Sequence, residues 1–346
     1  MQFKLVTFSE AGVQTAGLIL GDRAFYLADV RPMAAMLGMS LRSEGPLRDL
    51  LVHWDHDFPV LQQVVAALEA QPTAIKSQPL HDLELCAPLV PQQTFCAIGN
   101  YRSHIIQSAR SEATARSTDA GLPLVQQAAR DERLVAKRLE GEPYMCFKLP
   151  STISGPTDPL IIPQHARRTD WELELAVVIA RRCRNVTRSE AMQYVAGYTI
   201  ANDITVREAV FRQDVPKLGS DWLQSKNAPG FLPLGPFIVP RAFVPDPYAL
   251  RMRLRLNGQL MQDALVADML FDIASQIEYI SRHAALLPGD VICTGTPGGC
   301  GTHVGRYLQP GDQIEASISG LGTQRVRCIA EPSALQATMS TGTTPR

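Results

Sequence analysis

One stretch constrains the fold more than any other part of the chain: Asp170-Trp171-Glu172-Leu173-Glu174-Leu175, which continues into the apolar run 176–180. Acidic and large apolar residues alternate, and this period of two predicts a β-strand with its carboxylates on one face. Carboxylates two residues apart on a strand lie about 6.5 Å from each other and can converge on one cation. A solvated acidic face explains the alternation equally well. The apolar continuation instead predicts a strand buried on both faces, where carboxylates need a partner charge or a metal.

A third carboxylate, Asp203, ends the next predicted strand, which begins at Tyr198. Between the two strands, residues 187–190 (Thr-Arg-Ser-Glu) predict a capping box that opens a helix, and Gly197 would close it. A helix that connects the two strands can bring the chain back so that Asp203 lies beside Glu172 and Glu174. Oxygen ligands without Cys or His predict Mg²⁺ or Mn²⁺, with Ca²⁺ as the alternative. Taken alone, Asp203 could equally be a cap or turn residue.

The rest of the pattern predicts an α+β, mainly β chain. Helical spacing appears over residues 46–70, 104–140 and 267–286, and the Asn257-Gly258 turn after the alternating strand 251–256 predicts a hairpin. The helical segment 104–140 could be a mobile lid or a plain solvated helix. A Pro-rich stretch over 71–93 predicts three parts. These are a small N-terminal domain (1–85), a catalytic domain (86–332) and a polar tail (333–346).

Composition excludes several classes of protein. A formal net charge of -1 gives no electrostatic basis for nucleic acid or an anionic membrane as the main partner. No apolar run approaches the roughly 20 residues that span a membrane, and the first residues do not resemble a signal peptide. The seven cysteines are scattered and form no C-x-x-C pair, which predicts a reducing cytoplasm rather than a zinc ribbon or a disulfide scaffold.

Two further features suggest chemistry. His104 follows the buried strand 94–98 and is the best candidate for a general base, because an imidazole titrates near neutral pH; a hydrogen-bonded loop histidine is the alternative. The glycine-rich stretch Thr294–Gly301 could present backbone N–H groups to an oxyanion, or it could simply be a tight turn. It is not a P-loop, because no Gly-Lys-Ser/Thr follows.

Five motifs in this order resemble the fumarylacetoacetate hydrolase family over roughly residues 90–330. They are Ala97–His104 (AIGNYRSH), Asp170–Glu174 (DWELE), Ala201–Arg207 (ANDITVR), Lys226 before Pro233–Pro236 (PLGP), and Leu287–Pro297 (LPGDVICTGTP). The resemblance implies a rolled mixed β-sandwich with a small N-terminal domain, usually assembled as a homodimer.

The resemblance also implies roles for individual residues. Mg²⁺ or Mn²⁺ would lie on Glu172, Glu174 and Asp203, while Asp170 would only support the site. His104 would activate a water molecule as the catalytic base, and Lys226 and Arg207, the other two catalytic residues, would help the metal to stabilise the enolate that cleavage leaves. The expected substrate-binding residues are Tyr101, Lys148, Gly295 and Thr296.

The predicted activity is metal-dependent hydrolysis of a C–C bond in a β-dicarbonyl such as an acylpyruvate. One departure weakens it: many members carry Glu three residues after the histidine, where this chain has Gln107. Glutamine can orient an imidazole but cannot stabilise its cation as a carboxylate would, unless another acid such as Glu112 takes that role. The alternatives are a tautomerase, decarboxylase, hydratase or dehydratase of a 2-oxo acid on the same site, or a metal-binding protein without turnover.

Overall fold

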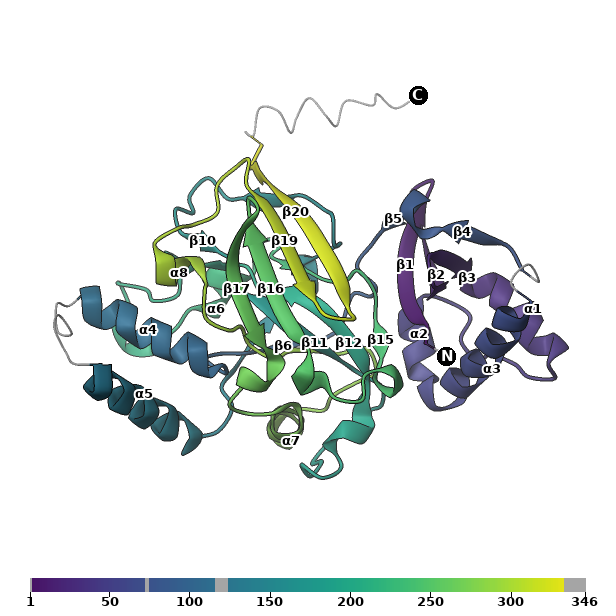
Figure 1. Cartoon of the computed structure of the whole chain (residues 1–346), viewed down its shortest axis with the longest axis horizontal. Helices are drawn as coiled ribbons and strands as arrows, with labels where there is room; N and C mark the ends of the chain where they lie inside the picture. Colours follow the sequence, from purple (N-terminus) through teal and green to yellow (C-terminus); the bar gives the residue numbers. More distant parts are fainter. Residues whose placement is uncertain (1, 72–74, 116–123, 333–346) are drawn as a thin grey trace.

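The computed structural model describes residues 2–71, 75–115 and 124–332, apart from the side chains of 112–115 and 124. The predicted polar tail lies outside the described residues. Figure 1 shows a smaller N-terminal unit on the right and a larger β-rich body on the left. Across the described ranges, no helix is long and apolar enough to cross a membrane.

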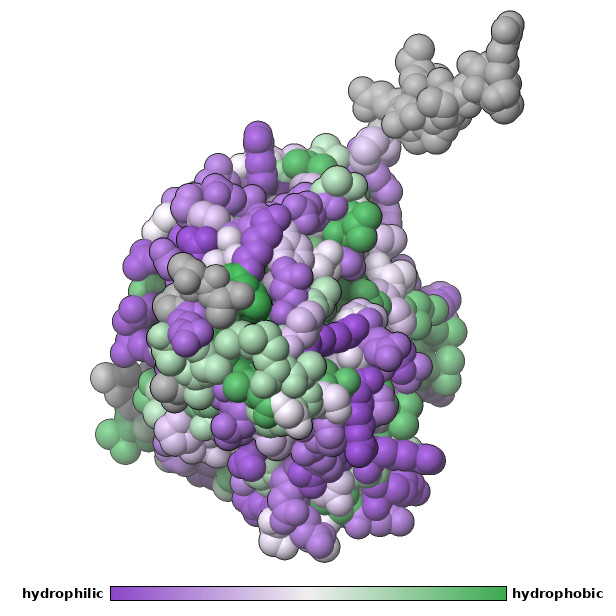
Figure 2. Space-filling model, turned by 90° about the vertical axis from the view of Figure 1, so that its right-hand side faces the viewer, coloured by the Kyte–Doolittle hydropathy of each residue, from purple (hydrophilic) through white to green (hydrophobic). Residues whose placement is uncertain are grey.

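The N-terminal unit is a five-stranded sheet covered by three helices. Its strand order is β4-β3-β2-β1-β5. The strands are β1 (Lys4–Glu10), β2 (Val13–Leu20), β3 (Arg23–Tyr26), β4 (Ser77–Pro79) and β5 (Glu84–Leu85). The helices are α1 (Leu27–Met36), α2 (Leu47–Val52) and α3 (Trp54–Ala70), so the helical spacing over 46–70 is confirmed. The surface at this end is largely hydrophilic, with apolar atoms in smaller patches (Figure 2).

Two large sheets form the β-rich body (Figure 1). The first has the order β15-β12-β11-β18-β6-β7 and comprises β6 (Thr94–Ala97), β7 (Met145–Lys148), β11 (Leu173–Ile179), β12 (Val195–Asn202), β15 (Val239–Pro240) and β18 (Val291–Cys293). The second has the order β17-β16-β19-β20-β9 and comprises β9 (Leu160–Ile162), β16 (Arg251–Leu256), β17 (Gln259–Leu265), β19 (Gln313–Ile318) and β20 (Gly322–Ala330). Parallel pairs, β18 with β6 and β20 with β9, make both sheets mixed.

Short elements complete the body. Two small sheets pair β10 (Thr169–Asp170) with β13 (Thr205–Val206), and β8 (Ile153–Ser154) with β14 (Leu232–Pro233). The helices are α4 (Arg102–Ala115), α5 (Leu124–Leu139), α6 (Trp222–Lys226), α7 (Ile273–His283) and α8 (Gly301–Val304). The 3₁₀ turns are Leu80–Asp82, Pro150–Thr152, Ala191–Tyr194, Arg207–Ala209, Pro216–Leu218, Arg241–Phe243, Pro247–Ala249 and Val266–Asp268.

Strand β11 is buried on both faces, as its apolar run predicts. Its odd-numbered residues from Leu173 to Ile179 pack into the core between the two large sheets. Ala176 and Val178 point the other way, into a core shared with N-terminal residues such as Leu5 and Leu18. The backbone of Leu5 also exchanges hydrogen bonds with Ile238, both at 2.8 Å. The α+β, mainly β sandwich expected from the sequence is confirmed, and the N-terminal sheet packs directly on it.

Three local predictions need correction. The strand predicted from Asp170 is interrupted, because β10 ends at Asp170 and β11 begins at Leu173. Thr187 and Glu190 do contact each other as in a capping box, at 2.6 Å, but only the 3₁₀ turn Ala191–Tyr194 follows. Gly197 lies inside β12, where a Cβ would lie 2.3 Å from the carbonyl oxygen of Val239, so close strand packing explains this glycine. Helix α7 is shorter than the predicted 267–286.

Asp57 in α3 offers a test of the N-terminal unit. Its buried carboxylate accepts the N–H groups of Arg42 and Ser43 at 2.8 and 2.9 Å. Burial opposes ionisation, but these hydrogen bonds prevail and hold the pKa of Asp57 below its usual value. Asp57→Asn should therefore lower the free energy of unfolding by about 2 kcal/mol at pH 7. The difference from wild type should shrink below about pH 4, as the wild-type carboxylate gains its proton.

Urea denaturation at pH 7 and pH 3 would measure this effect. Asp55→Asn is the matched control, because Asp55 is 59% exposed and pairs with Arg181 at the surface. The control should change stability by less than about 1 kcal/mol. Equal losses in the two variants would contradict the role assigned to Asp57.

Candidate active site

Three carboxylates meet at one end of β11 and β12. The antiparallel pairing sets Leu173 opposite Asn202, so Asp203 arrives beside Glu172, and its N–H donates to the Glu172 carbonyl at 2.8 Å. Glu172, Glu174 and Asp203 are buried, and each offers an oxygen within 4.8 Å of the others. The structure thus brings together the three residues that the sequence singled out.

Two lysines pair with this carboxylate cluster. Lys226 Nζ, at the end of α6, donates to Glu172 Oε2 at 2.8 Å, to Asp203 Oδ2 at 2.6 Å and to Thr205 Oγ1 at 2.8 Å. Lys148 Nζ, at the end of β7, lies 2.8 Å from Asp203 Oδ1. Both lysines are almost completely buried, so their charges are strongly felt by the carboxylates.

Arg207 connects the carboxylate cluster to Asp170. Its Nη2 lies 2.6 Å from Glu172 Oε1, and its Nε donates to Asp170 Oδ2 at 2.7 Å. Asp170 also accepts the N–H groups of Gly301 and Thr302 at 2.6 and 2.9 Å. Asp170 therefore supports Arg207 and the start of α8, in agreement with the supporting role expected for it.

The charges in the cluster do not balance. Burial opposes ionisation of Glu172, but Lys226 and Arg207 hold its pKa well below its usual value. Burial, together with the charges of Asp203 and Glu172, raises the pKa of Glu174 well above its usual value. Four carboxylates, including Asp170, face three cationic side chains. With all four carboxylates ionised the cluster would lack one positive charge, and the raised pKa of Glu174 shows that the three cations compensate this carboxylate least.

This imbalance fits a divalent cation. Asp203 Oδ1 is buried and accepts no hydrogen bond from the described residues, although Lys148 is near. A carboxylate-only set suits hard cations such as Mg²⁺ and Mn²⁺. The residues present therefore match the expected cofactor in charge, in ligand chemistry and in their available oxygen.

His104 lies in the first turn of α4, half-buried, without the carboxylate partner typical of a strong imidazole base. Its Nδ1 lies 3.8 Å from the Cys300 thiol, and its ring centroid is 4.9 Å from that of His303. Burial is the main reason that the pKa of His104 falls to about 3, although Glu172 acts in the opposite direction. No carboxylate among the described side chains is hydrogen-bonded to the ring.

The hydrogen bond made by the Gln107 side chain goes to the glycine-rich loop and not to His104. Gln107 Oε1 accepts the N–H of Gly299 at 2.7 Å, which ties α4 to the glycine-rich loop. The side chain of Glu112, the alternative acid, lies outside the described residues. In this structure, the side chain of Gln107 therefore anchors the glycine-rich loop to α4.

The glycine-rich loop uses its N–H groups internally rather than presenting them to an oxyanion. The N–H of Gly295 donates to Glu174 Oε2 at 2.7 Å, and that of Gly298 donates to Ser103 Oγ at 2.9 Å. The Thr296 hydroxyl donates to the Leu173 carbonyl at 3.0 Å. Gly295 and Thr296 thus orient Glu174 and β11, and their expected contact with a substrate stays a prediction.

Tyr101 lies directly before α4. It is fully buried in the core between the sheets, and its hydroxyl lies 3.5 Å from Met252 Sδ. An aromatic ring in this position fixes the start of α4. Lys148 is also buried and lies against Asp203, and the substrate contacts expected for both residues stay predictions.

Sequence reasoning missed three neighbours of this site. Gln262, on β17, accepts the N–H of Leu173 at 3.1 Å and donates to Thr296 Oγ1 at 2.9 Å; its place depends on sheet packing that no local pattern reveals. Cys300 and His303 lie beside His104. The Cys-x-x-His spacing of Cys300 and His303 is typical of metal ligands and could have identified these two residues from the sequence.

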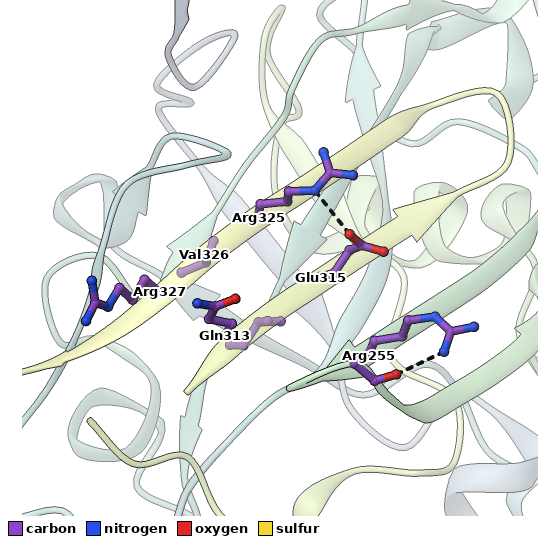
Figure 3. A pocket seen from close by; sticks show the side chains of 8 residues that line it. Arg255, Gln313, Glu315, Arg325, Val326 and Arg327 are labelled. Carbon is purple, nitrogen blue, oxygen red and sulfur yellow. Dashed lines mark hydrogen bonds and ion pairs between the residues drawn. The ribbon is translucent and has the colours of Figure 1, made fainter. Parts of the chain in front are cut away.

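Two pockets on the surface can be compared as routes for a substrate. An open pocket of about 710 Å³ is lined by Ser103, Gln107, Gly298 and Gly299 together with residues of β17 and the following turn, and by none of the three carboxylates. Another, of about 340 Å³, lies on the outer face of β16, β19 and β20 (Figure 3). There Arg325 points toward Glu315, and none of the lining residues belongs to the cluster. The first pocket, unlike the second, is lined by residues of α4 on either side of His104 in the sequence and by the glycine-rich loop, which makes it the better candidate for substrate entry.

Comparison with known proteins gives a consistent result. The model of the fumarylacetoacetate (FAA) hydrolase C-terminal domain matches residues 93–329. A 2,4-didehydro-3-deoxy-L-rhamnonate hydrolase of Sphingomonas is 41% identical over 189 residues, which cover 53% of this chain and 64% of that protein. An oxaloacetate tautomerase of Xenopus laevis, named as mitochondrial, is 30% identical over 298 residues, which cover 83% of each chain.

A solved structure agrees over almost the whole length. It is a probable 2-hydroxyhepta-2,4-diene-1,7-dioate isomerase from Mycobacterium abscessus, which is 29% identical with a TM-score of 0.69. The match covers 96% of this chain and 100% of that one, so it includes the N-terminal unit. The names of these three proteins describe a hydrolase, a tautomerase and an isomerase.

Proposed function

Because this chain belongs to the fumarylacetoacetate hydrolase family, we propose that it moves a proton within a 2-oxo acid, as a divalent-metal-dependent tautomerase or isomerase. The surroundings of His104 carry the proposal. Its Nδ1 faces the Cys300 thiol at 3.8 Å, and no described carboxylate is hydrogen-bonded to the ring. A carboxylate would stabilise the imidazolium, and without one the imidazole remains a weak base.

A weak base deprotonates an activated C–H bond more easily than it deprotonates water. Water has a pKa of about 15.7, whereas a C–H bond next to a carbonyl becomes far more acidic when a second carbonyl or a cation also stabilises the enolate. Proton transfer is efficient when the pKa values of base and acid are not far apart. Enolisation therefore demands less of His104 than hydrolysis does.

The residues take the following roles in the proposal. Glu172, Glu174 and Asp203 would hold Mg²⁺ or Mn²⁺, whose charge would favour the enolate form of the bound 2-oxo acid. His104 removes a proton from the carbon next to the carbonyl. The imidazolium then returns that proton to the enolate oxygen in a tautomerase, or to a more distant carbon in an isomerase.

Lys226, Arg207 and Lys148 act as positioning residues. Lys226 and Arg207 keep Glu172 ionised and fix both of its oxygens, while Lys148 lies against Asp203. Holding the carboxylates rigidly costs no reorganisation during the reaction. Two relatives support this class of chemistry, since their names describe an oxaloacetate tautomerase and a dienedioate isomerase.

The second candidate is the hydrolysis of an acylpyruvate-type C–C bond, as the sequence predicts. The Sphingomonas relative, named as a hydrolase, favours it. His104 would take a proton from water, and the hydroxide would attack the carbonyl remote from the carboxylate. The C–C bond would then break, and the released enolate would take the proton from the imidazolium. This path asks His104 to deprotonate water, which is the harder task.

Proton NMR in D₂O separates the two reactions. Oxaloacetate and a panel of acylpyruvates would be incubated with the Mn²⁺- or Mg²⁺-loaded enzyme and with the Glu174→Gln variant as control. Enzyme-dependent exchange or isomerisation at the carbon next to the 2-oxo group, without cleavage, is expected. Rapid release of pyruvate and a second acid would favour hydrolysis. Tight oxalate binding without any turnover would mean a metal-binding protein and would overturn both.

Gln107→Glu should shift the balance toward hydrolysis. Residues 104 and 107 are neighbours on one face of α4, so a carboxylate at position 107 can reach the imidazole. It should raise the pKa of His104 and increase acylpyruvate cleavage by about tenfold, since one pKa unit corresponds to a factor of ten. Gln107→Ala, which loses the Gly299 contact without adding charge, is the control. An increase in both variants, or in neither, would contradict this role of position 107.

Two features of the assembly complete the proposal. We infer that residues 1–85 and 86–332 form two domains, since β5 closes the first sheet at Leu85 and β6 opens the next one at Thr94. A homodimer is expected from the family resemblance. Sedimentation velocity at micromolar concentration would measure the mass of the particle, and a monomer would contradict the dimer.

A further inference from the structure

A second cluster of metal-ligand side chains lies beside the carboxylates. His104, Cys300 and His303 each offer a nitrogen or sulfur atom, and these atoms all lie within 4.8 Å of one another. Cys300 precedes α8, His303 lies within α8, and His104 lies on α4, which packs against α8. These three residues are called the His-Cys cluster below.

The distances suit a tetrahedral ion. With Zn–S near 2.3 Å and Zn–N near 2.0 Å, a sulfur and a nitrogen on the same zinc are about 3.6 Å apart. Cys300 Sγ and His104 Nδ1 are already 3.8 Å apart. Two imidazoles and a thiolate leave the fourth position to solvent, which the half-buried histidines can admit.

We propose that the His-Cys cluster is a second cation site, selective for borderline-soft ions such as Zn²⁺, next to the hard site formed by Glu172, Glu174 and Asp203. Soft thiolate and imidazole ligands prefer Zn²⁺, whereas the carboxylates prefer Mg²⁺ or Mn²⁺. The cation site itself does not depend on the proposed activity, whereas its effect on turnover rests on the proposed role of His104 as the base.

The present contacts of the ligands can be exchanged for a metal. The N–H of Gly299 lies 3.3 Å from His303 Nδ1, and His303 Nε2 lies 3.1 Å from Ser108 Oγ, so both ring nitrogens make contacts that are easily given up. Besides His104 Nδ1, Cys300 Sγ has long contacts with Pro297 O and Gln262 Nε2, both at 3.7 Å. Neutral imidazoles are the form that binds metals, and burial keeps both rings neutral by lowering their pKa.

The surrounding charges permit a cation. Arg207 is close enough to the thiol to oppose Zn²⁺ while favouring the thiolate, but Asp170 and Glu172 are also near and offset its charge. Binding forms a Zn–S bond and breaks the S–H bond of Cys300, and the thiol proton passes to solvent. Because burial raises the pKa of the Cys300 thiol, affinity should be weaker at low pH.

Occupation of the His-Cys cluster has a consequence for His104. Once its lone pair is shared with Zn²⁺, the imidazole can no longer accept a proton. Zn²⁺ should therefore inhibit an enzyme whose hard site is saturated with Mg²⁺. The reaction would be controlled by the concentration of a metal that is not its own cofactor.

Cobalt(II) is the probe that distinguishes the two sites. Tetrahedral Co²⁺ with a thiolate ligand gives a near-ultraviolet sulfur-to-metal band and strong visible bands, whereas an all-oxygen site gives only weak absorption. The wild-type protein, saturated with Mg²⁺, should develop the sulfur band with one equivalent of Co²⁺. One equivalent of Zn²⁺ should then abolish it.

Three variants decide the assignment. Cys300→Ala should eliminate the sulfur band, and His303→Gln should weaken Co²⁺ binding by at least about 10- to 100-fold. Cys86→Ala is the matched control, because Cys86 is a half-buried thiol outside the His-Cys cluster and should leave the band unchanged. A persistent band in Cys300→Ala, or no band in wild type, would overturn the proposal. If Cys300→Ala does not fold, unchanged affinity in His303→Gln overturns it as well.

Discussion

Asp203→Asn and Glu174→Gln should both lower turnover by at least about 100-fold, yet they should change the stability of the metal-free protein in opposite directions. Each variant removes one carboxylate from the oxygen set that would hold the divalent cation. The loss of metal affinity should be visible in a Mn²⁺ titration by calorimetry. The opposite effects on stability follow from the different neighbours of the two side chains.

Asp203 forms ion pairs with two buried lysines, whereas Glu174 lies close to two other carboxylates. Asp203 lies against both Lys148 and Lys226, so its neutralisation leaves two buried cations with less compensation. Breaking a buried pair of this kind should destabilise the metal-free protein by about 3 kcal/mol. Glu174, whose pKa is raised by burial and by the charges of Asp203 and Glu172, gains from losing its charge. Glu174→Gln should therefore stabilise the metal-free protein at neutral pH.

The pH dependence of the free energy of unfolding distinguishes the effect of Glu174 from that of Asp203. Because the folded pKa of Glu174 lies above its unfolded value of about 4.3, folding favours its protonated form. The metal-free wild type should lose stability as pH rises above that value and up to the folded pKa, whereas Glu174→Gln should not lose this contribution. Urea denaturation in chelator at pH 5 and pH 8 would measure the difference. Equal destabilisation in both variants would refute the excess of negative charge.

His104→Gln should reduce proton exchange by about 10²- to 10⁴-fold, with little effect on folding or on Mn²⁺ affinity. The side chain is half-buried, and its nearest partner is a thiol at 3.8 Å, so its removal breaks no strong contact. A loss of stability as large as that of Asp203→Asn would mean that His104 is structural. Full activity in His104→Gln would rule out its role as the base.

The pH profile should reflect the lowered pKa of His104. A base must be unprotonated to act, so activity falls as pH drops through its pKa. With that pKa lowered to about 3, kcat/KM at saturating Mn²⁺ should stay flat between pH 8 and pH 5. A limb near pH 6.5, the value of an ordinary histidine, would contradict the burial of this ring. In Gln107→Glu, which should raise the pKa of His104, the decrease of kcat/KM at acidic pH should begin at a higher pH.

Local patterns predicted the strands of this site well, because alternation and turn residues act over short distances. The run through Leu173–Ile179 predicted a strand buried on both faces, and the Asn257-Gly258 turn predicted the β16–β17 hairpin. The helix predicted after residue 187 was wrong. Favourable capping contacts exist there, but the close packing of Gly197 against β15 requires β12 to start by Val195.

The sequence by itself determined the carboxylate cluster. Acid alternation before an apolar strand, and an acid at the end of the next strand, bring Glu172, Glu174 and Asp203 together when the two strands pair antiparallel in the observed register, with Leu173 opposite Asn202. Only the tertiary structure decided the surroundings of His104. Cys300 and Gln107 reach their positions through the packing of α4 on α8 and on the glycine-rich loop, a contact between residues almost 200 positions apart. Side-chain contacts across such separations depend on the whole packed core, and no local pattern encodes them.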